Sequence, residues 1–269
     1  MENFKDFFIT YLNSQNLTFE IEENDFLSFI FKEKKIIINY FLKKSESKSQ
    51  PTHTLGYTKI NIWEDFWTNS KDIVMSRVNS LFGLNHRIPA RVCIIKRIEK
   101  KEAENFLNQN HLQKFVNAKL KYGLFLPLKY YRLLPDSLEK INENERLIGV
   151  MTFSNPKNYY FENNTIASFE LVRFATLMNF NIQGAFTKFL KHFIHDKKPG
   201  NIMTYVDKDW SDGLNFHKFG FEIISETQAM FYELNENGDR KQSVEKNDWK
   251  VKNSGSFKFI LSDFERYSK

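Results

Sequence analysis

Apolar and polar residues alternate with two different periods in the first third of the chain. Helical spacing over Phe4–Leu12 gives way to short alternating or apolar runs, which indicate strands. The expected strands are Leu17–Ile21, Phe26–Phe31, Lys35–Leu42 and Tyr57–Trp63. The polar stretch Lys43–Thr54 indicates a loop, and Glu64–Phe82 has the period of a helix that Gly83 ends.

Beyond residue 90 the pattern predicts alternating strands and helices. Gly, Asn and Pro around Leu84–Ala90 favour a break, so we place a domain boundary near residue 88, between residues 1–88 and 89–269. The expected strands are Arg91–Ile98, Tyr122–Leu134, Leu147–Phe153, Ser168–Ala175, Ile202–Val206 and Phe221–Ser225. The expected helices are Lys100–Val116, Gly184–His195 and a short one before Gly220, and the turn Glu236–Asp239 predicts hairpins within residues 229–262. The fold class is therefore α/β (α+β).

Composition limits the possible functions only loosely. The 269 residues are 41% hydrophobic, enough for a sizeable core, and carry a net charge of +6. This charge suits a polyanion, a phosphate-rich cofactor or an ordinary solvated surface. Cys93 is the only cysteine, which excludes an intrachain disulfide and a cysteine-based zinc site and indicates a reducing compartment. No apolar run is long enough for a signal peptide or a membrane-spanning helix, so we expect a cytoplasmic protein without a membrane partner.

Two junctions carry the candidate chemistry. In SFELVRFATLMNFNIQGAFTKFLKHF a strand passes through a small-residue loop into a helix, and in SDGLNFHKFGFE a short helix ends at Gly220 and enters a strand. With the order of elements around them, these junctions resemble the GCN5-related N-acetyltransferases, over roughly residues 91–234. The resemblance implies a mixed-sheet acyltransferase domain that uses acetyl-coenzyme A or another acyl-coenzyme A.

The loop before the second long helix is the candidate cofactor site. A pyrophosphate docks on a helix N-terminus only where backbone N–H groups are uncovered, which Gly184 and Ala185 allow. The resemblance extends the expected cofactor contacts to Gln183 and Phe186. The family pattern has a basic residue or Gln where this chain has Asn181, and Gly or Ala where it has Phe186. The alternative is that Gly184 only forms a turn before a core helix.

The candidate catalytic residues come from the same resemblance. Many relatives have a tyrosine general acid where this chain has Phe216, so Tyr205, His217, Ser211 or water is left to protonate the departing thiolate. Glu170 occupies the place of a general base, or else pairs with Arg173. His111 is a further candidate base or substrate contact, with a surface role as the alternative.

A wider resemblance covers residues 57–234. YTKINIWEDFWTNSKDIVMSRVNSLFG, RIPARVCIIKRIEKKEAENFLNQNHLQ and YVDKDWSDG resemble phage and mobile-element proteins described as Hef-like homing endonucleases. In those proteins a nuclease-like domain precedes a domain similar to the GCN5-related N-acetyltransferases (GNAT-like). The nuclease-like domain resembles the very short patch repair nucleases, which implies a restriction-endonuclease-like fold. Asp25 could be its first acidic ligand, but KKIIINYFL has no acidic pair, so we expect residues 1–88 to keep the fold without the metal site. Glu64 and Asp65 then serve as a helix-start pair.

Basic residues near the predicted boundary are candidate nucleic-acid contacts. Lys71, Arg77, Arg87 and Arg91, followed by Lys96 and Arg97, are interleaved with Trp63 and Trp67, a mixture suited to phosphate contacts and base stacking. The alternative is a solvated face around two core tryptophans.

The leading hypothesis is therefore an acyl-coenzyme A-dependent N-acyltransferase. Its acceptor is expected to be an amine on a nucleic acid or on an associated protein. The competing hypothesis is a non-catalytic nucleic-acid-binding protein of mobile-element origin, and a third is a residual nuclease.

Overall fold

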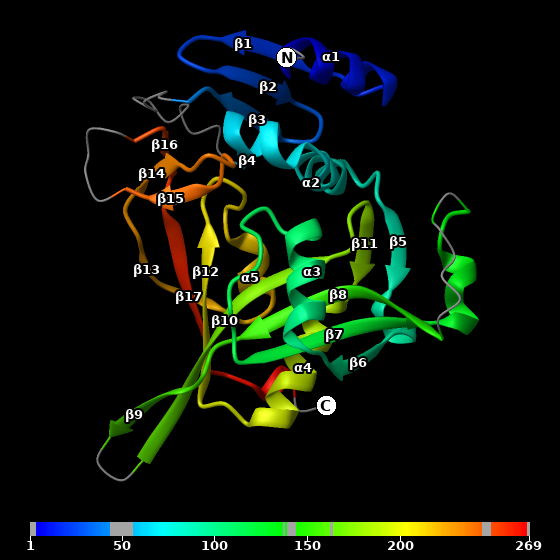
Figure 1. The fold of residues 1–269 in the computed structure, drawn as a ribbon. Coiled ribbons are helices and arrows are strands. Elements are labelled where there is room, and N and C mark those ends of the chain that lie inside the picture. Colours follow the sequence, from blue (N-terminus) through cyan, green and yellow to red (C-terminus); the bar gives the residue numbers. More distant parts are fainter. Residues whose placement is uncertain are drawn as a thin grey trace. The chain divides into compact units, whose positions relative to one another are not determined.

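The computed structural model describes residues 4–43, 56–136, 138, 144–161, 164–243 and 249–267, and it is a mixed α/β structure as expected (Figure 1). Its contacts divide the chain into two compact units. The first contains Met1–Lys71, Val206–Asn215 and Glu226–Phe257, and the second contains Asp72–Tyr205, Phe216–Ser225 and Lys258–Lys269. The boundary predicted near residue 88 falls inside the longest segment of the second unit, and the roles assigned to residues 1–88 and 89–269 stay predictions.

The first unit begins with a helix and a four-stranded sheet. Helix α1 is Phe4–Ser14, and the sheet has the order β1-β2-β3-β4, with β3 and β4 parallel. The strands are β1 (Glu20–Glu23), β2 (Leu27–Phe31), β3 (Ile36–Phe41) and β4 (Thr58–Trp63). Nearly all residues of β2 and β3 are buried, because their apolar runs leave few polar side chains to face solvent. From residue 44 to residue 55, the predicted loop lies outside the described residues.

Later segments of the chain complete this unit. They form a three-stranded sheet of β14 (Phe231–Leu234), β15 (Arg240–Gln242) and β16 (Val251–Lys252). Leu234 pairs with Arg240, so the predicted turn at residues 236–239 is confirmed. Gly238 adopts a φ of 75°, a left-handed conformation that glycine tolerates well.

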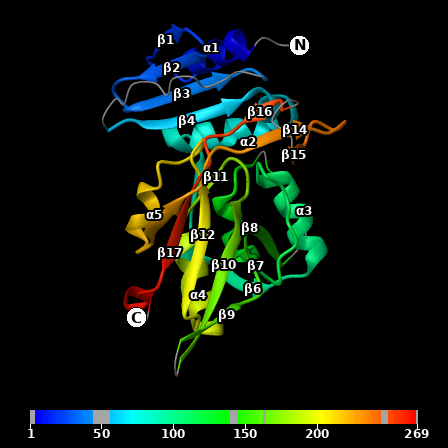
Figure 2. The same ribbon diagram turned by 90° about the vertical axis from the view of Figure 1, so that its left-hand side faces the viewer.

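The second unit is built on an eight-stranded sheet of order β13-β17-β12-β10-β8-β7-β6, with β9 paired to β10. Most of these strands are antiparallel, whereas β10 and β12 are parallel. The bounds are β6 (Ile94–Arg97), β7 (Leu120–Pro127), β8 (Glu145–Phe153), β9 (Lys157–Phe161), β10 (Asn164–Thr176), β12 (Asn201–Asp207), β13 (Glu222–Glu226) and β17 (Ser256–Leu261). Figure 2 shows the hairpin of β9 and β10 extending beyond one end of the sheet.

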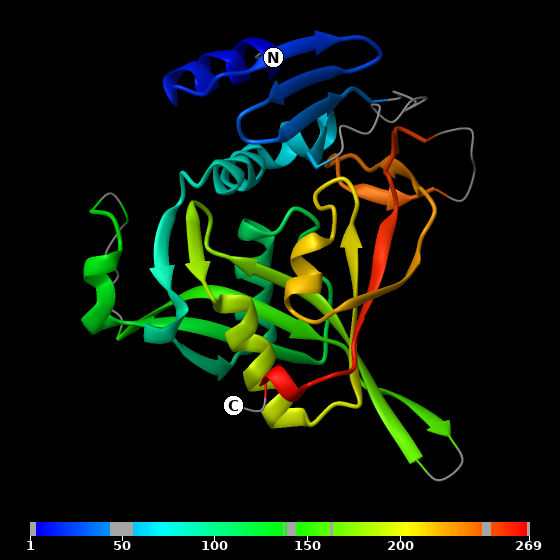
Figure 3. The ribbon, with the colours of Figure 1, turned by 180° about the vertical axis from the view of Figure 1, so that it is seen from behind.

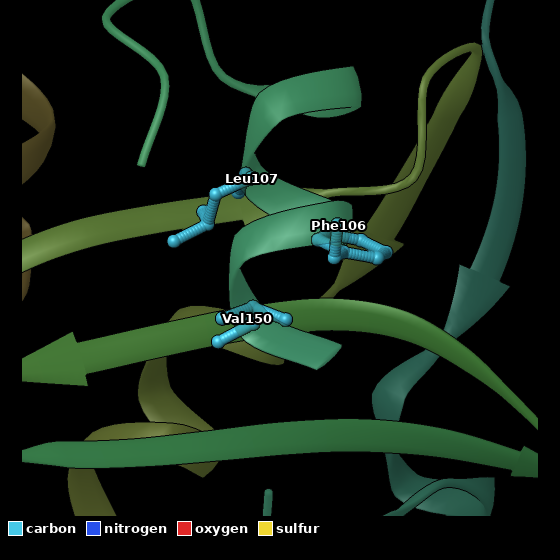
Figure 4. Packing of buried hydrophobic residues seen from close by; sticks show 5 residues of the cluster. Phe106, Leu107 and Val150 are labelled. Atoms are coloured by element: carbon cyan, nitrogen blue, oxygen red, sulfur yellow. The ribbon is translucent and has the colours of Figure 1, made fainter. Parts of the chain in front are cut away.

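Two helices cover opposite faces of this sheet. Helix α3 (Lys100–Asn110) packs Ala103, Phe106 and Leu107 against Val150 of β8 and Ala175 of β10 (Figure 4). Helix α4 (Ala185–Lys197) lies on the other face (Figure 3), where the ring of Phe193 stacks on Phe153 with centroids 3.6 Å apart. The two faces therefore have separate apolar layers, which hold the sheet between the helices.

Several expected boundaries were wrong. Helix α3 ends at Asn110 rather than near residue 116, and the strand expected over Tyr122–Leu134 ends at Pro127, followed by the 3₁₀ turn η2 (Leu128–Leu133). Proline lacks an N–H for the next ladder bond, which explains that early end. The strand expected at Arg91–Ile98 starts later, because Ala90–Val92 forms a 3₁₀ turn, η1.

The structure also contains elements that the sequence pattern did not reveal. Strand β5 (His86–Pro89) pairs in parallel with β11 (Phe180–Gln183), where a break and a loop were expected. Helix α2 (Glu64–Phe82) and the short α5 (Leu214–Lys218) lie where helices were expected, but α2 is kinked at Ser70, whose φ of −147° and ψ of 37° are not helical. Over the described ranges, none of the helices is both long and apolar enough to span a bilayer.

Candidate active site

A bulge in β10 sets the direction of the candidate catalytic side chains. Leu171 pairs with Phe153 of β8, but the next pair is Arg173 with Thr152, so Val172 is the extra residue. In a regular strand, residues three apart face opposite sides. The bulge reverses the alternation and places Glu170 and Arg173 on the same face, the face that α3 covers.

Glu170 lines a pocket of about 440 Å³ on this face. Its backbone is held by Ser154 of β8, since the Glu170 N–H donates to Ser154 Oγ at 2.9 Å and the Ser154 N–H donates to the Glu170 carbonyl at 2.9 Å. The pocket is lined by Val116, Asn117, Ala118, Lys119, Lys121, Ser154, Asn155, Glu170 and Val172. A half-buried carboxylate is therefore presented to a cavity of the size that small ligands occupy.

Arg173 links the segment after α3 to the bulge of β10. Its Nε donates to the Lys114 carbonyl at 3.1 Å and its Nη1 donates to the Val172 carbonyl at 2.9 Å. Burial lowers the pKa of the guanidinium, whereas the nearby Glu170 carboxylate raises it. Arg173 thus bridges the segment after α3 and strand β10, and the expected pairing with Glu170 takes the form of proximity on one face.

His111 lies at the end of α3 and is not among the residues that line the pocket. Its Nδ1 accepts the N–H of Gln113 at 3.2 Å. Burial, followed by the positive charges of Arg173 and Arg77, holds the pKa of the imidazole well below its usual range. The ring is therefore neutral at neutral pH, and its role as a base stays a prediction.

Strands β10 and β12 pair over a short distance only. The parallel register joins Ser168–Glu170 to Asn201–Met203, and the Thr204 hydroxyl donates to the Leu171 carbonyl at 3.0 Å. Because Met203 is the register partner of Glu170, Tyr205 lies on the Glu170 face two residues further along β12. Its side chain is 44% exposed. A hydroxyl thus stands on the same face as the carboxylate, beyond the paired segment.

The start of α4 has the features expected of an anion site. Gly184 is its N-cap, with φ 80° and ψ 5°, and the Lys188 N–H bonds the Gly184 carbonyl at 3.0 Å. The first N–H groups of a helix have no partner within the helix. A Cβ at Gly184 would come no closer than 4.0 Å to the nearest neighbour, Ala90, so the approach is open. Gln183 is exposed and Ala185 is buried, so backbone amides rather than side chains would bind a pyrophosphate here.

Phe186 and Phe216 belong to one aromatic cluster. The Phe186 ring lies against Phe174, Phe216, Phe219 and Phe221, with centroid distances from 4.6 to 6.3 Å. Phe216 also stacks on Phe259 at 5.2 Å. The Phe186 side chain is only 9% exposed because it belongs to this packing, so its expected contribution to a cofactor site would come from its backbone N–H and not from the ring.

A chain of neutral polar side chains crosses the sheet of the first unit, and the expected loss of a nuclease metal site stays a prediction. The side chains of Ser28, Asn39 and Asn61 form a chain of hydrogen bonds across β2, β3 and β4, with distances of 2.8 and 2.9 Å. Asn61 continues to Asp209 Oδ1 at 3.0 Å. Asn39 is fully buried, and neutral amides are poor replacements for the carboxylates that a divalent cation requires. Across the described ranges, no group of three or more His, Cys, Asp or Glu residues could hold a metal ion.

The candidate nucleic-acid contacts are divided between the units. Lys71 is in the first unit, with its ammonium 3.4 Å from the Phe7 ring centre, whereas Arg77, Arg87 and Arg91 are exposed residues of the second. Lys96 and Arg97 form ion pairs with Glu145 and Asp196 at 2.6 and 2.8 Å. Trp63 and Trp67 are 1% and 7% exposed, so these rings are core residues that cannot stack on bases.

Sequence reasoning missed the residues that surround Glu170. Lys119, Lys121, Ser154 and Asn155 belong to no motif, and only the register of β7, β8 and β10 brings them to one pocket. Of these four residues only Lys121 lies within a strand, and the other three flank β7 or β8.

Comparison with known proteins adds a likeness of fold. No family model matches the chain, and no curated protein matches it. Among solved structures, it is similar to the NatC complex bound to Gag peptide and CoA, with 13% identity, a TM-score of 0.37, and 64% of this chain and 98% of that chain covered. It is also similar to the Escherichia coli ribosomal-protein-S18-alanine N-acetyltransferase (11% identity, TM-score 0.37, 63% and 92% covered). For Arabidopsis thaliana NAA60 in complex with acetyl-CoA, the values are 11%, 0.41, 63% and 97%.

Proposed function

We propose that the second unit is an acyl-coenzyme A-dependent N-acyltransferase. The observation that carries this proposal is that Glu170 lines a pocket at the point where β10 and β12 cease to pair, and that the chain runs on from β10 through β11 to the open start of α4. Apart from β9 and β11, which were not predicted, the element order from β6 to β13 follows the one expected from the family resemblance, and it supports the same assignment.

The roles follow from the positions of the side chains. Gly184 and Ala185 would hold the pyrophosphate through backbone N–H groups, with Gln183 beside them. A bound acyl thioester would supply the acyl group, with transfer from the sulfur to the nitrogen of the acceptor amine. Glu170 accepts the proton of the acceptor amine, directly or through a water molecule. The acceptor on a nucleic acid or an associated protein stays a prediction.

Phe216 has no acidic proton, so another group must protonate the departing thiolate. The Tyr205 hydroxyl stands on the Glu170 face, which favours it over His217 and Ser211. Phe216 is also the observation that favours the second candidate function, a non-catalytic nucleic-acid-binding protein. In that case the second unit keeps the fold and the pocket without acyl transfer.

Thermal unfolding with acetyl-coenzyme A tests the assignment without requiring turnover. A ligand at 100 times its Kd should add about 2.7 kcal/mol to the stability of the wild type. Gly184→Trp should lose that shift, because the indole would cover the helix start. Gly56→Trp is the matched control, since Gly56 also has a positive φ, with open space around it. No shift in the wild type would reject the cofactor site and leave nucleic-acid binding as the function to test.

An acyl-transfer assay then tests Glu170. Glu170→Gln should lower kcat by about 10²- to 10⁴-fold, as loss of a general base does, while the acetyl-coenzyme A shift remains. Glu222→Gln, at an exposed position of β13, is the control. An unchanged rate in Glu170→Gln would show that this carboxylate is not the base.

A further inference from the structure

Two lysines share the pocket with Glu170. Lys119 is the residue before β7, and Lys121, the second residue of that strand, is the register partner of Thr152 on β8. Strand alternation places Lys121 on the side of the sheet on which Glu170 lies, and Lys119 and Ser154, which flank β7 and β8, line the same pocket. Over the part of the chain that the structure describes, neither ammonium is paired with a carboxylate.

The charges are separated by one strand. Strand β8 lies between β7 and β10, and neighbouring strands are about 4.8 Å apart, so the backbones that carry the lysines and Glu170 are roughly 10 Å apart. The pocket therefore has a positive side and a negative side within the length of a small molecule or of one residue of a polymer. An amine without an anionic group would leave the two lysines without a counter-charge. An amine that carries a second cation would be repelled by the lysines.

We propose that this pocket selects an amine that also carries an anionic group, a carboxylate or a phosphate, a few bonds from the nitrogen. Lys119 and Lys121 bind the anion, and Glu170 faces the amine. The inference rests on the proposed function for its choice of an amine, but binding of such a molecule can be measured without acyl transfer.

Isothermal titration of the full chain, without coenzyme A, tests the selection with three probes of similar length. These are 3-aminopropyl phosphate, 4-aminobutanoate and 4-aminobutanamide, which keeps the ammonium group but has a neutral amide in place of the anion. Charge-assisted hydrogen bonds contribute enough that at least one anionic probe should bind roughly tenfold or more tightly than the amide. The tighter of the two anionic probes identifies phosphate or carboxylate as the group recognised.

Substitutions of the two lysines then test whether they bind the anionic group. The double change Lys119→Gln and Lys121→Gln should weaken the anionic probe by roughly ten- to a hundredfold and leave the amide unchanged. The change of both lysines to Arg should keep the preference for the anion. Lys100→Gln with Lys101→Gln, two exposed lysines at the start of α3, is the control with the same change in net charge.

Two results would overturn the inference: equal affinity for all three probes, or an anion preference that survives the double Gln change. Retained, lysine-dependent binding with no acyl transfer to any probe would count against the proposed function alone. Conversely, a normal acetyl-coenzyme A shift with equal affinities would reject only the selection for an anion.

Discussion

The rings of Phe186 and Phe216 meet edge to face, with centroids 5.5 Å apart and an interplanar angle of 80°. These are two of the positions at which the chain departs from the pattern of the acetyltransferases it resembles. A small residue at the first position and a tyrosine at the second would leave a gap and a hydroxyl where this protein has an aromatic contact. The two departures are therefore linked by packing.

A double-mutant cycle should detect this link. We expect Phe186→Leu and Phe216→Leu to show a coupling free energy of about 0.5–1.5 kcal/mol in urea unfolding, because edge-to-face pairs contribute beyond the area they bury. Phe186→Leu combined with Phe125→Leu, from β7, is the control cycle and should be additive to within about 0.5 kcal/mol. Additivity of the first pair would mean that the two rings fill the cluster independently.

Arg173 offers a test of how the pocket is held. Its guanidinium bonds two carbonyls from different nitrogens, which a single ammonium cannot reproduce in that geometry. Arg173→Lys should therefore lower the free energy of unfolding by about 1–3 kcal/mol and raise KM for the acceptor more than it changes kcat. Arg91→Lys, at an exposed site, is the control. A change in kcat alone would instead place Arg173 in the chemistry.

Features of the site that have a local sequence pattern could be predicted, whereas features that depend on pairing between strands could not. Helix α4 was predicted because its apolar residues recur with the helical period and Gly184 stands at its start. The same spacing rule could not show the Val172 bulge, since a bulge is defined by the partner strand. It likewise could not show that Glu170 and Arg173 share a face.

The short parallel pair of β5 and β11 had no detectable signal. Each strand has only four residues, and in β5 only Ile88 is buried, so neither has a period long enough to recognise. Pairing between strands far apart in sequence is decided by tertiary packing, which local propensity does not report. The same limit concealed Lys119 and Lys121.

His111 should give the second unit a specific pH dependence. Its pKa is lowered on folding, so below about pH 6.5 the unfolded chain takes up a proton that the folded chain does not. The free energy of unfolding should therefore decrease as the pH is lowered below about 6.5. In urea unfolding between pH 5.5 and 8, His111→Gln should lose this component. His195→Gln, an exposed histidine of α4, controls for removal of an imidazole, and identical profiles for wild type and His111→Gln would contradict the prediction.

Asp65 and Arg240 connect the late hairpin to the start of α2 within the first unit. Arg240 donates from Nε to Asp65 Oδ2 at 2.7 Å and from Nη2 to Asp65 Oδ1 at 3.1 Å, and its guanidinium lies 3.9 Å from the Phe66 ring centre. The Asp65 side chain is only 2% exposed. The hairpin thus supplies the counter-charge for a buried carboxylate.

Removing that counter-charge should be costly. Arg240→Met leaves Asp65 buried and unpaired, and we expect a loss of about 3–5 kcal/mol in the free energy of unfolding. Adding Asp65→Asn should recover part of the loss, because the residue left behind is then neutral. Lys241→Met, at the exposed neighbouring position of β15, should change stability by less than about 0.5 kcal/mol. If Arg240→Met were as stable as the wild type, the ion pair would contribute nothing, and packing of the hairpin strands would be left to hold it in the first unit.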